Sequence, residues 1–308
     1  MSSGHADLWG IDLGGTKVEG IILKSVDQKE PLFRDRVPTE ANKGYQHVLN
    51  QIAGLVGKME SQAGYRPSRI GIGTPGTMDP FTGLFKNSNS IVLNYKPLRT
   101  DLEQLLGMEV VTANDANCFA LAETRLGVVK EKFSDAKVVF GVIMGTGTGG
   151  GIVVNGQVLN GKHGIAGEWG HNFLDESGGE CYCGKTGCVE NVISGPALER
   201  YYLSQSGESK RLKEIVELAK SQLDEVAIAT LNRLHTMFGK ALSVVINILD
   251  PDVIVIGGGV GNIDTIYTEG IENVKKYVFN DRLDTPITRP ILGDSAGVYG
   301  AAFLVENR

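Results

Sequence analysis

Residues 8–23 read LWGIDLGGTKVEGIIL, in which two apolar stretches flank a pair of glycines. The apolar and β-branched residues on both sides of Gly14 and Gly15 predict a β-hairpin with a tight turn. Glycines without a Cβ let several backbone N–H groups converge on a polyphosphate, and Thr16 and Lys17 add a hydroxyl and an ammonium. The segment indicates a hairpin with a phosphate-binding tip, whereas most lone glycine pairs form only a turn.

A second segment of the same kind begins at residue 138 and reads VVFGVIMGTGTGGGIVVNG. Gly141 and Gly145 in this segment have the same spacing as Gly10 and Gly14 in the first, which indicates a weak internal repeat. Two matched loops in a duplicated layout favour a shared function. The loop of this second segment, which we call the second phosphate cradle, consists of Gly145, Thr146, Gly147 and Thr148.

Strand and helix patterns alternate through the rest of the chain. A long helix is expected from about residue 224 to 249, followed by a strand at 253–256 and a glycine turn at 257–259. This alternation predicts an α/β fold with largely parallel sheets in two similar domains. We expect a smaller domain of residues 1–114 with a C-terminal helix over 295–308, capped by Asp294 or Ser295, and a larger domain of residues 115–294.

The composition favours small-molecule chemistry. The 308 residues are 42% hydrophobic and carry a formal net charge of -6, without a basic patch for nucleic acid or anionic membrane. No apolar run approaches the roughly 20 residues of a membrane span, and the N-terminal segment lacks the apolar stretch of a signal peptide. We therefore expect a cytoplasmic protein long enough for two packed domains with a cleft between them.

Three of the four cysteines are clustered. Cys181, Cys183 and Cys188 form C-x-C-x4-C, and His171 lies ten residues upstream. In a reducing compartment this set favours a metal over disulfides, and three thiolates with one imidazole complete a tetrahedral zinc site. A closed site of this kind is structural, because it leaves no position for the activated water of a zinc hydrolase. Reduced loop cysteines without a metal are the alternative.

Two glycine strings imitate the nucleotide motifs of other proteins. Residues 179–186 satisfy G-x-x-x-x-G-K-[ST], but an acidic segment rather than a hydrophobic strand precedes them. Residues 257–259 follow a strand but lack the G-x-G-x-x-G continuation of dinucleotide-binding folds. The sequence therefore argues against a P-loop at the cysteines and against a dehydrogenase.

Polar side chains flank the cysteine cluster, and others lie at the start of an expected helix. Glu168 precedes His171 by three residues, and Glu190 follows the last cysteine by two. A metal loop would fix both carboxylates, which suit sugar hydroxyls, although each alone is more often a solvated surface charge. Asn114 and Asp115 lie where a strand passes into a helix, and there Asp115 can act as a helix cap or as a functional carboxylate.

These motifs resemble those of the ROK (repressor, open reading frame, kinase) sugar kinases over essentially the whole chain. The matching strings are IDLGGTK at 11–17, GIGTPG at 71–76, NDANC at 114–118, GTGTGGG at 145–151, GEWGHN at 167–172, CYCGKTGCVE at 181–190 and DPDVIVIGGG at 250–259. The resemblance implies two actin-like domains of the hexokinase type, related to ribonuclease H, with a zinc loop at 171–188. It also implies ATP-dependent phosphorylation of a free hexose with Mg²⁺, and a homodimer.

The resemblance further implies roles for individual residues. Asp115 would accept the proton of the attacking sugar hydroxyl. Sugar contacts would come from Gly76, Asn114, Asp115, Glu168, His171 and Glu190, and His171 would also bind zinc with Cys181, Cys183 and Cys188. ATP and Mg²⁺ would be bound by Asp12, Gly14, Gly15, Thr16 and Lys17, by Gly145, Thr146, Gly147 and Thr148, and by Gly257, Gly258 and Gly259 near the adenosine.

The expected substrate is D-fructose, converted to fructose 6-phosphate. GEWGHN, CYCGKTGC and KNSNSIVLN at 86–94 resemble bacterial fructokinases of the manno(fructo)kinase type, whereas N-acetylglucosamine kinases of the family tend to carry GEFGH and CGCG. Glucose, mannose and N-acetylhexosamines are the alternatives. A sugar-sensing transcriptional regulator of the same family is disfavoured, because only 11 residues precede Asp12, too few for a helix-turn-helix.

Overall fold

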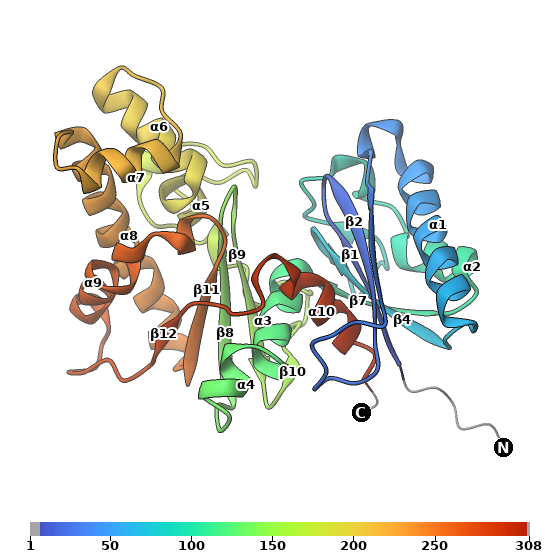
Figure 1. Cartoon of the computed structure of the whole chain (residues 1–308). Coiled ribbons are helices and arrows are strands. Elements are labelled where there is room, and N and C mark those ends of the chain that lie inside the picture. The colour runs from blue at the N-terminus through green and yellow to red at the C-terminus, as the bar shows by residue number, and fades with distance from the viewer. Residues whose placement is uncertain (1–6, 307–308) are drawn as a thin grey trace. The chain divides into compact units, whose positions relative to one another are not determined.

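The structure is a computed structural model that describes residues 7–306. The chain divides into two compact units. Their residues can be followed in Figure 1 by the colour bar, which gives residue numbers. The first contains the chain up to residue 135, residues 151–166 and the chain from residue 291; the second contains residues 136–150 and 167–290. The α/β class is confirmed, and the domain boundary at residue 115 stays a prediction. Among the described residues, no helix has the length and apolar character needed to span a membrane.

The sheet of the first unit has the strand order β3-β2-β1-β4-β7. β1 (Leu8–Leu13) pairs antiparallel with β2 (Lys17–Leu23), which confirms the predicted hairpin, and β2 pairs antiparallel with β3 (Phe33–Pro38). β4 (Arg69–Thr74) is parallel to β1 and to β7 (Glu109–Asn114). The carboxyl ends of these three parallel strands therefore lie at one edge, where open α/β sheets bind their ligands.

The two faces of this sheet have different neighbours, because successive side chains of a strand point to opposite faces. Apolar β1 side chains such as Ile11 join the core beneath α1 (Tyr45–Ala63) and α2 (Leu98–Leu106). The opposite face is covered by α10 (Ala296–Phe303), and α10 packs against α3 (Asp115–Arg125) (Figure 1). Asp12, next to Ile11 on β1, therefore faces α10.

Shorter elements complete this unit. They are β5 (Thr77–Met78), β6 (Phe85–Lys86), α4 (Val128–Lys132) and the 3-10 turns Ala41–Lys43, Ile91–Leu93 and Gly293–Ser295. The side chain of Ser295 makes no capping hydrogen bond to α10, so the cap predicted from this residue is wrong. Its hydroxyl instead accepts a hydrogen bond from Arg34 at 2.7 Å, which ties β3 to the start of α10.

The second sheet has the order β10-β9-β8-β11-β12. Its strands are β8 (Val138–Met144), β9 (Thr148–Val154), β10 (Gln157–Val158), β11 (Val253–Gly257) and β12 (Ile287–Thr288). β8, β11 and β12 run parallel to one another. The second glycine segment thus forms strand, turn and strand as predicted, and β9 continues from the second unit into the first after Gly150.

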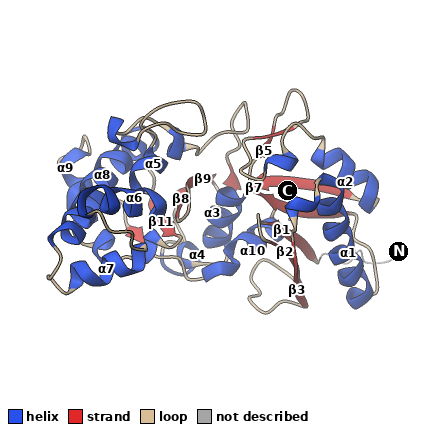
Figure 2. Cartoon of the chain, turned by 90° about the horizontal axis from the view of Figure 1, so that it is seen from above, coloured by secondary structure: helices blue, strands red, loops and turns tan. Residues whose placement is uncertain are grey.

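Helices make up much of the second unit (Figure 2). They are α5 (Val189–Ile193), α6 (Gly195–Ser206), α7 (Leu212–Lys220), α8 (Glu225–Leu249) and α9 (Glu269–Tyr277), with 3-10 turns at Trp169–His171, Glu176–Gly178, Val260–Asn262 and Asp264–Tyr267. α8 matches the long helix predicted. Its N-cap is Asp224, whose side chain accepts from the backbone N–H of Ala227 at 2.9 Å, and the helix packs against α9.

Candidate active site and metal centre

The first glycine loop joins β1 to β2. The N–H of Gly14 donates to the carbonyl of Lys17 at 2.9 Å and closes the turn. Thr39 supports the loop from the end of β3: its hydroxyl donates to the Gly14 carbonyl at 2.7 Å, and its N–H donates to the Thr16 carbonyl at 3.0 Å. Gly15 and Thr16 remain exposed at the tip. A supported turn with an exposed backbone is the arrangement that a phosphate group requires.

Asp12 lies at the carboxyl end of β1, two residues before this turn. A Cβ on Gly297 would lie 2.8 Å from Oδ2 of Asp12, so the carboxylate lies directly against the first turn of α10. Burial, together with the charges of Asp115 and Glu19, raises the pKa of Asp12 to about 7, and Lys17 opposes the rise. A carboxylate in this state gains strongly from a nearby cation, because the cation favours its charged form. The donor chemistry of Asp12 therefore suits Mg²⁺.

Asn114 and Asp115 lie at the carboxyl end of β7, where α3 begins. Asn114 is the N-cap: its Oδ1 accepts from the N–H of Ala116 at 2.8 Å. Oδ1 of Asp115 accepts from the same N–H at 2.8 Å, so both side chains take part in opening the helix. Asp115 keeps solvent-accessible surface, while desolvation by the surrounding protein raises the pKa of its carboxyl. The carboxylate of Asp115 is thus accessible from solvent and is more basic than that of an ordinary aspartate.

Gly76 belongs to the same edge of the first sheet. The hydroxyl of Thr74 lies 2.9 Å from the Gly76 carbonyl and 3.2 Å from the carbonyl of Ala113. The turn after β4 is therefore adjacent to the end of β7, one residue before Asn114. Asp12, the first glycine loop, Gly76 and the start of α3 form one surface within the first unit.

The second glycine loop, in the second unit, joins β8 to β9. Gly145 donates to the carbonyl of Gly147 at 2.9 Å, and the N–H of Thr148 donates to Oε2 of Glu190 at 2.9 Å. The hydroxyl oxygen of Thr148 is buried without a partner in the described structure, which is unusual for a native protein and suits a ligand contact. Glu190, expected at the sugar, thus also supports the second glycine loop.

The glycine turn after β11 adjoins this cradle. A Cβ on Gly145 would lie 3.8 Å from the backbone nitrogen of Gly259. Gly258 has a φ of 85° and closely approaches the backbone of Met144, so a side chain at this position would clash. β8 and β11 are parallel neighbours, and their two turns form one glycine-lined surface at the sheet edge.

The cysteine cluster has the geometry of a zinc site. The ligand atoms of His171, Cys181, Cys183 and Cys188 all lie within 4.8 Å of one another. Nδ1 of His171 is 3.7 Å from Sγ of Cys181, and Sγ of Cys183 is 3.6 Å from Sγ of Cys188. Zinc–ligand bonds of about 2.0–2.3 Å in a tetrahedron separate neighbouring ligand atoms by about these distances. The four side chains therefore fit the structural zinc ion predicted from their spacing.

His171 turns its other ring nitrogen away from the sulfur atoms. Nε2 lies 3.0 Å from the hydroxyl of Tyr182, and the two rings meet edge to face with centroids 5.2 Å apart. Partial burial and the charges of Glu190 and Glu168 raise the pKa of the Tyr182 phenol. The two glutamates predicted for sugar binding thus lie in the electrostatic environment of the phenol that contacts His171.

Trp169 fixes the turn that carries Glu168 and His171. Its indole N–H donates to the carbonyl of Gly149 at 3.0 Å, and its ring packs edge to face on Phe140 of β8. The side chain is 4% exposed. The metal loop is therefore attached to the sheet beside the second glycine loop.

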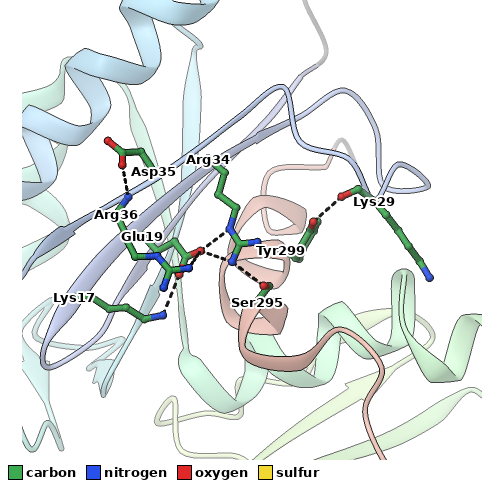
Figure 3. A network of polar contacts seen from close by, with 8 residues as sticks. All are labelled: Lys17, Glu19, Lys29, Arg34, Asp35, Arg36, Ser295 and Tyr299. Atoms are coloured by element: carbon green, nitrogen blue, oxygen red, sulfur yellow. Dashed lines mark hydrogen bonds and ion pairs between the residues drawn. The ribbon is translucent and has the colours of Figure 1, made fainter.

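A buried acidic residue beside the first loop was not predicted from the sequence. Glu19 on β2 lies among the cationic side chains of Lys17, Arg34 and Arg36 (Figure 3). Lys17 and Glu19 are two residues apart in an apolar strand, and Arg34 and Arg36 are two apart in the next strand. Alternating charges on neighbouring strands are the signal that could have located this network.

Two α/β units with glycine loops at the ends of parallel strands, together with a carboxylate at a helix start and a histidine–cysteine cluster, define the sugar kinase class. The chain belongs to the ROK family, whose family model matches residues 8–308. The expected enzyme class, an ATP-dependent sugar kinase, is confirmed by the kinases that match the chain over nearly its whole length.

Known proteins of this family match the chain over nearly its whole length. The N-acetyl-D-glucosamine kinase of Vibrio cholerae serotype O1 is 37% identical over 306 residues, which cover 96% of this chain and 98% of that protein. The corresponding kinase of Haemophilus influenzae is 35% identical over 307 residues, covering 96% and 98%. A ROK hexokinase from Thermus thermophilus has a TM-score of 0.84 at 33% identity, with 97% of each chain covered. A ROK family glucokinase from Streptomyces griseus, in complex with glucose and AMPPNP, has a TM-score of 0.77 at 27% identity, covering 97% and 98%.

Proposed function

We propose that this chain transfers the terminal phosphoryl group of ATP to a hydroxyl of N-acetyl-D-glucosamine. The observation that carries the substrate is the identity of 35–37% to N-acetyl-D-glucosamine kinases over 96% of the chain. These relatives give no support to fructose, which the sequence cues had favoured, so we replace that expectation.

Two of the features that suggested fructose have structural roles in this fold. Trp169 is buried and anchors the turn before His171. In the segment KNSNSIVLN, the N–H of Ser88 donates to Oδ1 of Asn94 at 3.0 Å, and Asn94 donates back to the Ser88 carbonyl at 2.9 Å. Side chains that organise their own loops carry little information about the sugar.

Asp115 is the group best suited to act as general base. Its carboxylate is accessible at the start of α3, and its raised pKa makes it a stronger base than an ordinary aspartate. It would accept the hydroxyl proton while the sugar oxygen forms a bond to the γ-phosphorus and the bond to the bridging oxygen of ADP breaks. Base catalysis of this kind contributes about 10² to 10⁴-fold to a rate.

Phosphoryl transfer depends mainly on positioning and on neutralising charge. We assign the ATP phosphates to the two glycine loops, Gly14–Lys17 and Gly145–Thr148, and the adenosine to the turn at 257–259. Asp12 would hold Mg²⁺, which supplies charge neutralisation to the phosphates when bound. The exposed amides of the first loop and the unpartnered hydroxyl of Thr148 support these assignments.

The sugar contacts that we propose are Gly76, Asn114, Glu168, His171 and Glu190. Because Oε2 of Glu190 accepts from Thr148, its Oε1 is the oxygen that we assign to a sugar hydroxyl. A zinc ion on Nδ1 of His171 would leave a proton on Nε2, which then donates to a ligand. Zinc in this role is structural: it fixes the loop that carries the sugar contacts.

A substrate panel with purified protein, ATP and magnesium tests the proposal. We expect kcat/KM for N-acetyl-D-glucosamine to exceed that for glucose, mannose and fructose, because a site built for one pattern of polar groups rejects analogues that leave a group unpaired. Asp115→Asn is the control for phosphorylation by a contaminant. A higher kcat/KM for fructose or glucose would refute the substrate and leave the kinase class intact.

A further inference from the structure

The β2–β3 hairpin buries a charged network beside the first glycine loop. Glu19 is 1% exposed, and its carboxylate contacts three cationic side chains. Nε and a terminal nitrogen of Arg34 each lie 2.6 Å from Oε1, and Arg36 reaches the same oxygen at 3.4 Å. Nζ of Lys17 lies 3.2 Å from Oε2 (Figure 3). One buried carboxylate therefore organises three cations that come from two strands.

Strand register places this network on the face that carries Asp12. Glu19 pairs with Asp12 of β1 on one side and with Arg36 of β3 on the other, so the three side chains point to the same face of the sheet. Lys17 shares that face because it is two residues from Glu19. The network and Asp12 are thus neighbours on the sheet face that α10 covers.

Arg34 extends the network to α10. The guanidinium that contacts Glu19 also donates to the hydroxyl of Ser295 at 2.7 Å (Figure 3). Two residues further along, a Cβ on Gly297 would lie 2.8 Å from Asp12. Glu19 therefore connects the last residue of the glycine loop, Lys17, with the helix start against which Asp12 lies.

Stability alone does not account for this arrangement. Burial would raise the pKa of the Glu19 carboxyl, but hydrogen bonds from Arg34 and Lys17 outweigh burial and lower it. Apolar residues of similar volume commonly replace a buried ion pair without loss of stability. The network, by contrast, leaves an excess of positive charge beside a loop assigned to phosphates. Lys17 is 39% exposed, so its ammonium can bind a second anion.

We propose that Glu19 is a positioning residue of the phosphate site, which acts by holding the Lys17 ammonium in place beside the first glycine loop. This inference rests on the proposed assignment of that loop to ATP. A lysine that is already held in place loses less side-chain freedom when a phosphate binds, so it binds the phosphate more tightly.

The test is Glu19→Gln, which keeps the shape of the side chain and removes its charge. We expect kcat/KM for ATP to fall about 10- to 150-fold, the range for a lost hydrogen bond to a charged group, with KM for the sugar unchanged. Calorimetric titration with AMPPNP and magnesium should show the same loss of affinity without turnover. Glu19→Asp keeps the charge at a shorter reach and should recover part of the affinity.

Glu123→Gln is the matched control. Glu123 is also fully buried in the first unit, and its carboxylate accepts from the backbone N–H groups of Val128, Ile291 and Leu292. Its replacement should lower the melting temperature but leave nucleotide affinity unchanged. A fall in AMPPNP affinity equal to that of Glu19→Gln would show a general effect of a lost buried charge and overturn the inference.

A double-mutant cycle with Lys17→Met tests whether Glu19 affects nucleotide binding through Lys17. If Glu19 acts through Lys17, Glu19→Gln should change AMPPNP affinity little in the Lys17→Met background. Additive losses, or full affinity in a folded Glu19→Gln protein, would overturn the inference. Should Glu19→Gln not fold, Glu19→Asp enters the same cycle. Wild-type protein that binds AMPPNP but phosphorylates no sugar would refute the proposed function alone.

Discussion

Asp12→Asn should stabilise the protein while it removes activity. The Asp12 carboxyl lies against Gly297 and shares its surroundings with Asp115 and Glu19, two further acidic groups. Burial and these charges raise its pKa from 3.8 to about 7, so ionising the carboxyl works against folding. An amide has nearly the same shape and cannot ionise. The substitution therefore removes an unfavourable buried charge, and it also removes the carboxylate that we assign to magnesium.

The magnitude follows from proton linkage. A raised folded-state pKa gives stability that is fully present below about pH 3.8 and is lost as the pH rises through about 7. One pKa unit corresponds to about 1.4 kcal/mol, so ionised Asp12 lowers the free energy of unfolding by on the order of 4 kcal/mol at pH 8. At pH 6 the deficit is about 3 kcal/mol. The gain from Asp12→Asn should therefore grow between these two pH values.

Urea unfolding at pH 6, 7 and 8, without nucleotide or divalent metal, measures this gain. The same samples supply the activity: kcat/KM for ATP should collapse, while sugar binding by calorimetry stays near the wild-type value. Magnesium with AMPPNP should stabilise the wild type more than the variant, because only the wild type has the carboxylate. A variant that is less stable than the wild type at pH 8, or a gain that shrinks with rising pH, would refute the reasoning.

Four further predictions concern the base, the metal, Tyr182 and assembly. Asp115→Asn should lower kcat by about 10² to 10⁴-fold with little change in sugar affinity, and near-normal turnover of a folded variant would exclude this residue as the base. Purified protein should contain about one zinc per chain, and Cys183→Ser or chelation should lower the melting temperature and the sugar affinity together; metal analysis without zinc contradicts this. Tyr182→Phe frees Nε2 of His171, so the sugar KM should fall by roughly fivefold at unchanged zinc content, the effect of about one net hydrogen bond, whereas a raised KM would make the phenol a sugar contact. Light scattering should give the mass of a homodimer, and a monomer mass at micromolar concentration would contradict the family resemblance.

Local sequence patterns were sufficient for several features of the fold, although both sheets are mixed and the prediction of largely parallel sheets is wrong. The hairpin at 8–23 follows from β-branched residues around Gly14 and Gly15, and the restart at residue 138 follows from the same pattern. α8 ends at Leu249, as expected from the apolar pattern, and Asp250, with a left-handed φ of 44°, is its C-cap. Such features depend on neighbours in the sequence, so a single sequence contains them.

The supports of the site depend on residues that are distant in the sequence. Thr39 holds the turn at Gly14 across 25 positions, and Thr148 engages Glu190 across 42. Spacing could identify Glu190 as a fixed carboxylate, but not that one of its oxygens accepts from the second glycine loop. Three-dimensional packing alone brings these partners together, so the sequence can suggest individual residues for the site but not the network that connects them.

The choice of substrate was also difficult to predict from the sequence alone. The cues for fructose were side chains next to the motifs, and the structure gives two of them internal partners: Trp169 bonds Gly149, and Asn94 bonds Ser88. A residue that stabilises its own loop can vary with the loop rather than with the sugar, so its identity is a poor guide to selectivity. Tyr182 differs, because its hydroxyl lies 3.0 Å from the ring nitrogen assigned to the sugar. Any sugar that uses this nitrogen must displace the phenol or share the nitrogen with it. Selectivity should therefore respond to Tyr182 and be insensitive to conservative changes at Asn94.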